Sequence, residues 1–308
     1  MMPGAARRRG LRAWWHRRGW EGAVVGLPFL WLAAFVLLPF LIVLLMSVAT
    51  RTPTAPPFGW GGANPLVSLE GYGRLVTDDL YGRAFLNSLG LASVATVLCL
   101  LLGYPMALAL ARQPAERRTL LLMLVILPFW TSFLLRVYAW MSLMGTSSWF
   151  NRALTGAWNW ATPWDLRALP LMHSSLAVVL VTAYTYLPFM VLPLYANLER
   201  LDPALDEAAM DLGSRPLRVF WDVTLPQSWP GIVAGGLLVF IPAAGELVIP
   251  TLVGDAGTPM IGRLIADEFT QGRDWPMAAA AAVALVVVMV APTVLYSRLQ
   301  ARAERGRP

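Results

Sequence analysis

The chain has 308 residues, of which 57% are hydrophobic and 14% charged, whereas about 25% are charged in a typical soluble domain. This composition excludes a soluble globular, disordered or coiled-coil protein and indicates a polytopic α-helical membrane protein. All 24 basic residues are arginine, so a P-loop or a Schiff-base enzyme, each of which needs a lysine, is excluded. One cysteine and two histidines are too few for a disulfide framework or a Cys/His metal cage, and no cofactor is expected.

Six long apolar runs bounded by charged residues predict six transmembrane helices. They are Ala23–Ala49, Phe85–Ala111, Leu120–Met144, His173–Leu198, Trp229–Val253 and Met277–Tyr296. The first run follows six arginines, like a signal peptide, but it exceeds the roughly 7–15 apolar residues of a cleavable segment, so we expect it to be retained. The predicted organisation is an N-terminal tail (1–22), a first helix (23–49), an extracytoplasmic loop (50–84), a transmembrane domain (85–297) and a C-terminal tail (298–308).

The arginines are unevenly divided between the two sides of the predicted spans. The side that holds both tails carries 16 arginines, and the opposite side carries 7. Because positive charge accumulates on the cytoplasmic side, we expect both termini in the cytoplasm of a bacterial cell, with the chain in the inner membrane. The 7 outward arginines are offset by 8 acidic residues, so the +6 net charge is a signal for membrane orientation, and no nucleic-acid partner is expected.

Three outward loops, Thr50–Ala84, Gly145–Met172 and Gly254–Pro276, are longer than simple turns and rich in tryptophan. These tryptophans have two interpretations, an aromatic belt at the membrane surface or a docking surface for an extracytoplasmic partner. The residues concerned are Trp60, Trp149, Trp158, Trp160, Trp164 and Trp275.

The loop between the fourth and fifth spans, residues 201–232, predicts two short amphipathic helices. Asp202 suits an N-cap and Pro203 a first helical residue, Gly213 suits the left-handed end of this helix, and Pro216 can start the next. Each helix has an apolar stripe, but the polar face of the first is acidic. A helix on a lipid surface would carry basic residues there, so a groove on a protein partner is the better fit.

This loop resembles the EAA loop of permease subunits of bacterial ABC importers, a specific motif whose spacing is fully present. Three residues separate the EAA run from glycine, and nine more precede an aliphatic-x-Leu-Pro sequence. The resemblance implies a type I importer fold and a coupling helix that docks on separate ATPase subunits, so the chain itself is not expected to be an enzyme. The implied coupling residues are Glu207, Ala208, Ala209, Asp211, Gly213, Leu225 and Pro226.

Other strings along the chain, such as LPFWTSFLLRVYAW and FIPAAGELVIPTLVG, are similar to the first of the two permeases of spermidine/putrescine importers. This resemblance implies a second, homologous permease, an extracytoplasmic solute-binding protein and a polyamine substrate. Permeases for iron, sulfate or aminophosphonate have related spans, so another solute is the alternative. An ion-coupled secondary transporter is a further alternative, but it would normally have several intramembrane carboxylates and an internal repeat.

Glu246 is the only acidic residue within the predicted spans, and such a residue is a candidate functional site. Two hypotheses remain open: Glu246 faces a cationic substrate, or it forms an ion pair with Arg136, which lies at nearly the same depth. Glycines at 231 and 235 predict close helix packing near the start of this span. The candidate substrate-pathway residues are Glu246, Trp130, Tyr184, Tyr186 and Arg136, the aromatic ones because their rings can bind an amine.

Overall fold

The structure is a computed structural model. It describes the backbone of residues 5–61, 65–163, 165–255 and 257–305 and, within these ranges, the side chains of residues 24, 26–291, 293 and 294. The predicted tails extend into residues 1–4 and 306–308, which lie outside the described residues, as does Trp164.

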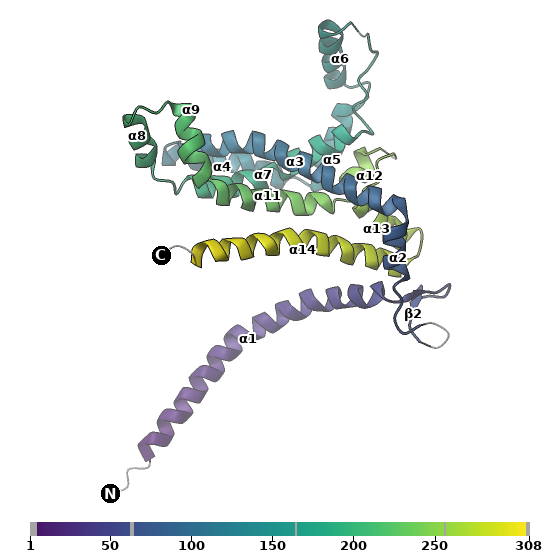
Figure 1. Ribbon diagram of the computed structural model, residues 1–308, viewed down its shortest axis with the longest axis vertical. Helices are drawn as coiled ribbons and strands as arrows, with labels where there is room; N and C mark the ends of the chain where they lie inside the picture. Colours follow the sequence, from purple (N-terminus) through teal and green to yellow (C-terminus); the bar gives the residue numbers. More distant parts are fainter. Residues whose placement is uncertain (1–4, 62–64, 164, 256, 306–308) are drawn as a thin grey trace. The chain divides into compact units, whose positions relative to one another are not determined.

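The described residues are mostly helical (Figure 1). The first elements are α1 (Ala5–Ser47), β1 (Thr50–Arg51), β2 (Phe58–Gly59), α2 (Glu70–Thr77), α3 (Asp79–Ala111), α4 (Ala115–Ile126), the 3-10 turn η1 (Leu127–Trp130), α5 (Phe133–Met144), α6 (Trp149–Ala161) and α7 (Ser175–Leu198). The others are α8 (Pro203–Asp211), α9 (Pro216–Val219), the π-helical turn η2 (Phe220–Thr224), α10 (Leu225–Gln227), α11 (Trp229–Ala244), α12 (Val248–Val253), α13 (Ile261–Thr270) and α14 (Trp275–Arg305).

The predicted count of six spans is consistent with these helices without matching it exactly. Within the described residues, Gly26–Ser47 of α1, α3 and α7 are long and apolar enough to cross a membrane. Two bent pairs of helices raise the number to five if each pair is one span, and Trp275–Ala291 of α14 is a shorter apolar segment.

The third and fifth predicted spans are not single helices, which corrects the sequence prediction. Ala115–Trp130 and Phe133–Met144 meet at an angle of 88°. Pro128 lies just before this break, and because it has no N–H and its ring collides with the preceding turn, the α-helix changes to a 3-10 turn there. The bend itself falls at Thr131 and Ser132, where ψ is 151° and 136°. In the fifth span, α11 ends at Ala244 and α12 begins at Val248, where Pro250 likewise removes a donor.

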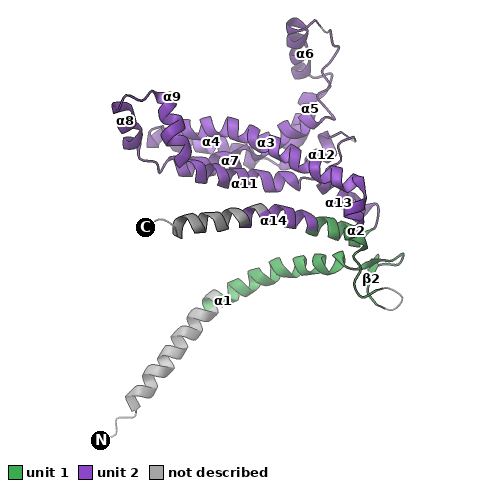
Figure 2. Ribbon diagram, viewed as in Figure 1, with its two compact units in different colours: residues 1–72, 274–283 green, residues 73–273, 284–308 purple. Residues whose placement is uncertain are grey.

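The chain forms two compact units (Figure 2), the first comprising residues 1–72 and 274–283. In this unit, the antiparallel strands β1 and β2 pair Thr50 with Gly59. The Tyr72 hydroxyl donates a hydrogen bond of 2.8 Å to Ser47 Oγ. Asp274 caps the start of α14, where its Oδ1 accepts from the Met277 N–H at 3.1 Å.

The second unit comprises residues 73–273 and 284–308, and its core is built by α3, α7 and α11. Met190 of α7 lies between Gly103 and Gly235. A Cβ added at Gly103 would be 3.1 Å from the Met190 Cγ, and one added at Gly235 would be 2.9 Å from the Met190 Sδ. A Cβ at Gly231 would likewise be 2.8 Å from Cβ of Asn197. The close approach predicted from Gly231 and Gly235 is therefore confirmed, since neither position has room for a side chain. Within this unit, α8 and α9 lie at one end of the bundle and α12 and α13 at the other (Figure 1).

Candidate functional site

The sequence 202–214 forms the first predicted helix of the EAA loop and its glycine bend. Asp202 Oδ1 accepts from the Ala204 N–H at 3.0 Å, which fixes the start of α8. At its end Gly213 has φ +88°, and its N–H reaches the Met210 carbonyl at 2.8 Å. The Ser214 N–H closes a wider ring to the Ala209 carbonyl at 3.1 Å. Together these bonds are a Schellman motif, the helix ending that glycine favours.

The second helix of the loop contains a feature that the sequence pattern did not predict. It begins at Pro216, as expected, but widens into the π-helical turn η2 before Pro226. Because Pro226 has no N–H and its ring needs room next to the preceding turn, one additional residue in that turn relieves the clash. The chain then bends by 65° between Gln227 and Trp229 to enter α11.

The tip of this α8–α9 hairpin carries large apolar side chains that nothing in the described part of the chain covers. Leu212 is 89% exposed, Leu217 76% and Trp221 62%. Of the predicted coupling residues, Glu207, Ala208, Asp211, Gly213 and Pro226 are exposed, and Ala209 and Leu225 are half-buried. The hairpin therefore offers an apolar tip with carboxylates beside it, a surface suited to a groove on another protein.

Asp206 faces the opposite way and connects the hairpin to the bundle. Its Oδ1 accepts from the Thr224 hydroxyl at 3.2 Å, which joins α8 to η2. Its Oδ2 lies 3.5 Å from Arg112, the residue that ends α3. Tyr104 of α3 adds a second connection, since its hydroxyl hydrogen-bonds Ser228 Oγ at 2.9 Å and its ring packs on Phe220 at 5.5 Å.

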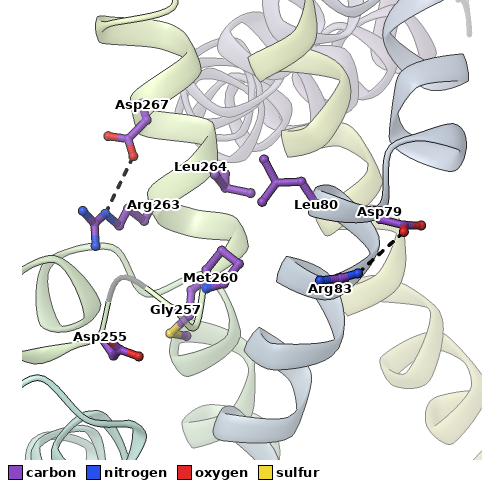
Figure 3. A pocket seen from close by; sticks show the side chains of 10 residues that line it. Asp79, Leu80, Arg83, Asp255, Gly257, Met260, Arg263, Leu264 and Asp267 are labelled. Carbon is purple, nitrogen blue, oxygen red and sulfur yellow. Dashed lines mark ion pairs between the residues drawn. The ribbon is translucent and has the colours of Figure 1, made fainter.

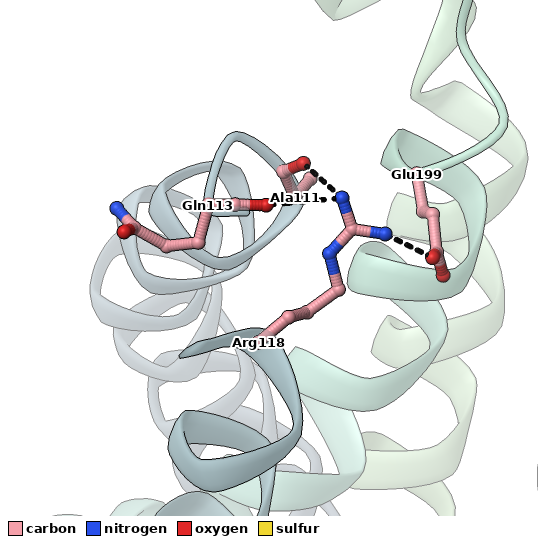
Figure 4. Close-up of polar contacts among 4 residues, drawn as sticks. All are labelled: Ala111, Gln113, Arg118 and Glu199. Atoms are coloured by element: carbon pink, nitrogen blue, oxygen red, sulfur yellow. Dashed lines mark hydrogen bonds and ion pairs between the residues drawn. The ribbon is translucent and has the colours of Figure 1, made fainter. Parts of the chain in front are cut away.

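Arg118, in the first turns of α4, joins three helix ends (Figure 4). Its Nη1 donates to the Glu199 carboxylate at the end of α7, and its Nη2 donates to the carbonyls of Ala111 and Gln113 at 3.2 and 3.1 Å. A hydrogen bond from Tyr195 and then the Arg118 guanidinium lower the pKa of Glu199 below its ordinary value. Glu199 is therefore a carboxylate at neutral pH, and it precedes α8 by only a few residues.

Glu246 lies in the break between α11 and α12, at the opposite part of the bundle. Its Oε2 accepts from the Tyr186 hydroxyl of α7 at 2.5 Å, and its Oε1 accepts from the backbone N–H groups of Val248 and Ile249 at 3.1 and 3.4 Å. The carboxylate thus caps α12, because it accepts from N–H groups that have no carbonyl partner where the helix is interrupted. Gly262 of α13 closes over the break, where a Cβ would be 2.6 Å from the carbonyl oxygens of both Gly245 and Glu246.

A chain of aromatic rings extends from Glu246 to Arg136 and so connects the two broken helices. The ring of Tyr186 is 6.0 Å from that of Phe189, which lies 5.0 Å from Phe129 beside the first break. The Arg136 guanidinium carbon is 5.3 Å from the centre of the Phe129 ring and 5.9 Å from that of Phe133.

The described residues contain no ion pair between Glu246 and Arg136, so the pairing hypothesis has no contact to support it here. Arg136 instead has Nε and Nη1 buried without a hydrogen-bond partner among the described residues. Of the other predicted pathway residues, Tyr184 packs against Trp140 at 5.5 Å, and Trp130 is 78% exposed and belongs to no described aromatic pair. The structure therefore brings Tyr186 to Glu246, and leaves Tyr184 and Trp130 apart from it.

A cavity of about 530 Å³ lies between the start of α3 and α13 (Figure 3). Two of its acids are paired within their own helices, Asp79 with Arg83 at 3.7 Å and Asp267 with Arg263 at 3.7 Å. Asp255 supplies a third carboxylate at its rim.

Sequence reasoning missed several residues of both sites, namely Tyr104, Arg112, Arg118, Glu199, Asp206 and Gly262. Each acts through a contact distant in sequence, such as the 81 residues between Arg118 and Glu199. Only Asp206 carried a local signal, as the acid next to the EAA run, and nothing in that pattern shows that it faces inward.

Comparison with known proteins gives one family for nearly the whole chain. Residues 22–306 match the family described as binding-protein-dependent transport system inner membrane component. The spermidine/putrescine transport system permease protein PotB of Haemophilus influenzae is 37% identical over 89% of this chain and 92% of that protein. The Escherichia coli K12 protein of the same name is 39% identical over 87% of this chain and 93% of that protein.

Similarity extends to solved structures and to a relative with another solute in its name. A putative 2-aminoethylphosphonate transport system permease protein PhnU of Salmonella paratyphi A is 28% identical over 76% of this chain and 80% of that protein. A bacterial ABC transporter involved in alginate import has the same fold, with a TM-score of 0.62 at 18% identity, covering 95% of this chain and 98% of the other. The chain therefore belongs to the family of inner membrane components of binding-protein-dependent transport systems, as the EAA loop implied.

Proposed function

We propose that this chain is the first permease subunit of an ATP-driven polyamine importer. In this proposal a binding protein outside the membrane delivers spermidine or putrescine, and the chain forms the pathway with a second permease. Two ATPase subunits dock on the cytoplasmic loops of the permeases, and the α8–α9 hairpin is the docking loop of this chain. The observation that carries the proposal is that hairpin, with its glycine at φ +88° and its exposed apolar tip. The polyamine assignment is supported by the printed names of the most similar relatives.

The hairpin is suited to transmit movement because its two attachments lead to different helices. Asp206 connects it to α3 through Arg112, and Glu199 connects its base to α4 through Arg118. A partner that pulls on Leu212 and the neighbouring apolar residues would therefore move the ends of α3, α4 and α7 together. The orientation expected from the arginine count, with both termini in the cytoplasm, puts this hairpin on the side where ATP is available.

The proposed substrate site is the region where both helix breaks meet α7. Discontinuous helices commonly form transporter substrate sites, because their free backbone groups line the pathway. Glu246 provides a carboxylate there, 9% exposed, and Tyr186 provides a hydroxyl and an aromatic face for an ammonium group. Arg136 lies at the other end of the ring chain, and its positive charge would lower the affinity of this region for cations.

Replacement of Gly213 tests the coupling role. Gly213→Ala places a side chain in a left-handed conformation, at a cost of about 1–2 kcal/mol, although no atom lies within 4 Å of the new Cβ. We expect the transporter to insert and assemble normally but to lose most ATP-driven uptake in reconstituted vesicles. Gly90→Ala is the control, since its Cβ also meets nothing within 4 Å and its φ is not left-handed. Normal uptake by Gly213→Ala would refute the coupling role.

Replacement of Glu246 tests the substrate site. We expect Glu246→Gln to assemble normally, because the amide oxygen can still accept from the backbone of α12, and to transport polyamines severalfold less well. A structural role for the charge predicts a low yield of assembled transporter instead. Binding of polyamines, iron chelates and aminophosphonates by the partner binding protein would identify the solute independently of Glu246.

A further inference from the structure

Helix α6 has its polar side turned inward and its apolar side turned outward. Asn151 and Thr155, one turn apart, are buried, with exposed fractions of 0% and 5%. Asn151 Nδ2 donates to the carbonyls of Met144 and Leu169 at 3.1 and 2.9 Å, and Thr155 Oγ1 accepts from the Leu169 N–H at 3.0 Å. These bonds hold the segment after α6, around Leu169, against this side of the helix. Its polar groups are therefore already paired within the chain.

The opposite side of α6 is an exposed stripe without charge, which we call the α6 stripe: Trp149, Ala153, Gly156 and Trp160. These residues recur at i, i+4, i+7 and i+11, so they share one face of a helix. Trp149 is 69% exposed and Trp160 91%, and the two are about 16 Å apart along the axis at 1.5 Å per residue. Two tryptophans at the ends of a flat, small-residue face form a surface that needs an apolar neighbour.

Chain connectivity keeps this stripe close to the membrane. Four residues, Gly145 to Ser148, separate the end of α5 from the start of α6, and they can span at most roughly 14 Å. In Figure 1 the axis of α6 runs across the direction of α3, α7 and α11, which cross the membrane. Helix α5 packs against α12 and the start of α7, at the end of the bundle opposite the α8–α9 hairpin. A helix that starts there and runs across the spans lies along the membrane surface.

We propose that α6 lies in the membrane–water interface with the α6 stripe in contact with lipid. Tryptophan is the residue most suited to this depth, because its ring is apolar and its N–H can bond to headgroups or water. The only charge on α6 is Arg152, a cation at the flank of the stripe that can bind lipid phosphate. The lipid contact would hold the α5 end of the bundle at a fixed depth, and it depends only on the chain being a membrane protein.

Spin labels at single cysteines test this proposal in the full-length transporter in lipid nanodiscs. Cys99 is the only native cysteine and is buried, so Cys99→Ser gives a suitable background. Ala153→Cys reports on the centre of the α6 stripe and leaves both tryptophans intact. Arg167→Cys is the matched control, because Arg167 is exposed and lies in the segment after α6 that covers the other side of this helix.

We expect the label at 153 to be accessible to oxygen and protected from a water-soluble nickel chelate, with an accessibility ratio severalfold higher than at 167. Replacing both tryptophans by alanine should reduce that ratio. Equal nickel access at 153 and 167 would mean that the stripe is in water, and protection of 153 from both reagents would mean that a protein covers it. Either result would overturn the proposal.

Discussion

The second unit contains two sets of arginine and glutamate whose surroundings differ. At the α8–α9 end, Arg118 contacts Glu199 directly and donates to two carbonyls, in a half-exposed position. At the helix breaks, Glu246 is satisfied by neutral donors, and Arg136 has two buried nitrogens without a partner among the described residues. The comparison indicates that the first set fixes helix ends, whereas the second keeps its two charges apart.

The largest expected effect comes from filling the space at the break itself. Gly262→Ala would put a Cβ 2.6 Å from two backbone carbonyl oxygens and push α13 away from Glu246. We expect a destabilisation of about 1–3 kcal/mol or more, the usual cost of overpacking, measured as a lower midpoint of thermal unfolding in detergent. Gly236→Ala is the control, since its nearest atom is 3.9 Å away. Equal midpoints for the two variants would contradict the close approach.

A smaller loss is expected from removing the neutral donor to Glu246. Tyr186→Phe leaves Oε2 without the hydroxyl that lies 2.5 Å from it, which costs about 1–3 kcal/mol for a buried acceptor. Tyr184→Phe should have little effect, because its hydroxyl makes no hydrogen bond to the described residues. Thermal unfolding of the two variants compares them directly. If Tyr184→Phe proved as damaging, the hydrogen bond to Glu246 would not be the reason.

At the α8–α9 end, a substitution of Arg118 can separate the effect of the guanidinium shape from the effect of its charge. Arg118→Lys keeps the positive charge, but one ammonium cannot reach Glu199 and both carbonyls with the geometry of the guanidinium fork. We expect transport per ATP hydrolysed to fall severalfold while the subunits still assemble. Arg83→Lys should leave the ratio unchanged, since Arg83 pairs with Asp79 on an exposed surface away from the hairpin. An unchanged ratio in Arg118→Lys would assign the contact to stability alone.

The smallest effect is a pH dependence at Glu199. The pKa of Glu199 is lowered in the folded protein, chiefly by the hydrogen bond from Tyr195. The ionised carboxylate therefore stabilises the fold fully above the ordinary pKa of 4.5, and this stabilisation is lost as pH falls through the lower pKa of the folded state. The stability difference between wild type and Glu199→Gln should therefore stay constant from about pH 8 to 5 and shrink only in stronger acid. A difference that already changes near pH 6 would exclude a paired carboxylate.

Sequence reasoning succeeded where the signal is local. The span positions follow from apolar length, the glycine bend from Gly213 and its flanking caps, and the close packing of α11 from Gly231 and Gly235. It failed where the position of a side chain depends on a contact with a residue distant in sequence. The pairing of Glu246 with Tyr186, 60 residues away, could not be read from spacing.

The helix breaks were accessible in principle, because Pro128 and Pro250 are visible in the sequence. Proline is common within membrane spans, however, and α7 tolerates both Pro188 and Pro193 without ending. What distinguishes the breaks is the presence of replacement partners, such as the Glu246 carboxylate for the N–H groups of α12. Helix α6 was missed for a related reason: its buried side is polar, so the usual apolar pattern is inverted.

The bare apolar tip at Leu212, Leu217 and Trp221 also has a consequence for how the cell must produce this protein. A copy synthesised without the ATPase that we propose to cover this tip would expose an apolar surface to other polypeptides. Excess copies would thus be prone to aggregation and to recognition by quality-control proteases. Under the proposed function, the exposed tip of the hairpin therefore requires that permease and ATPase be made in balanced amounts.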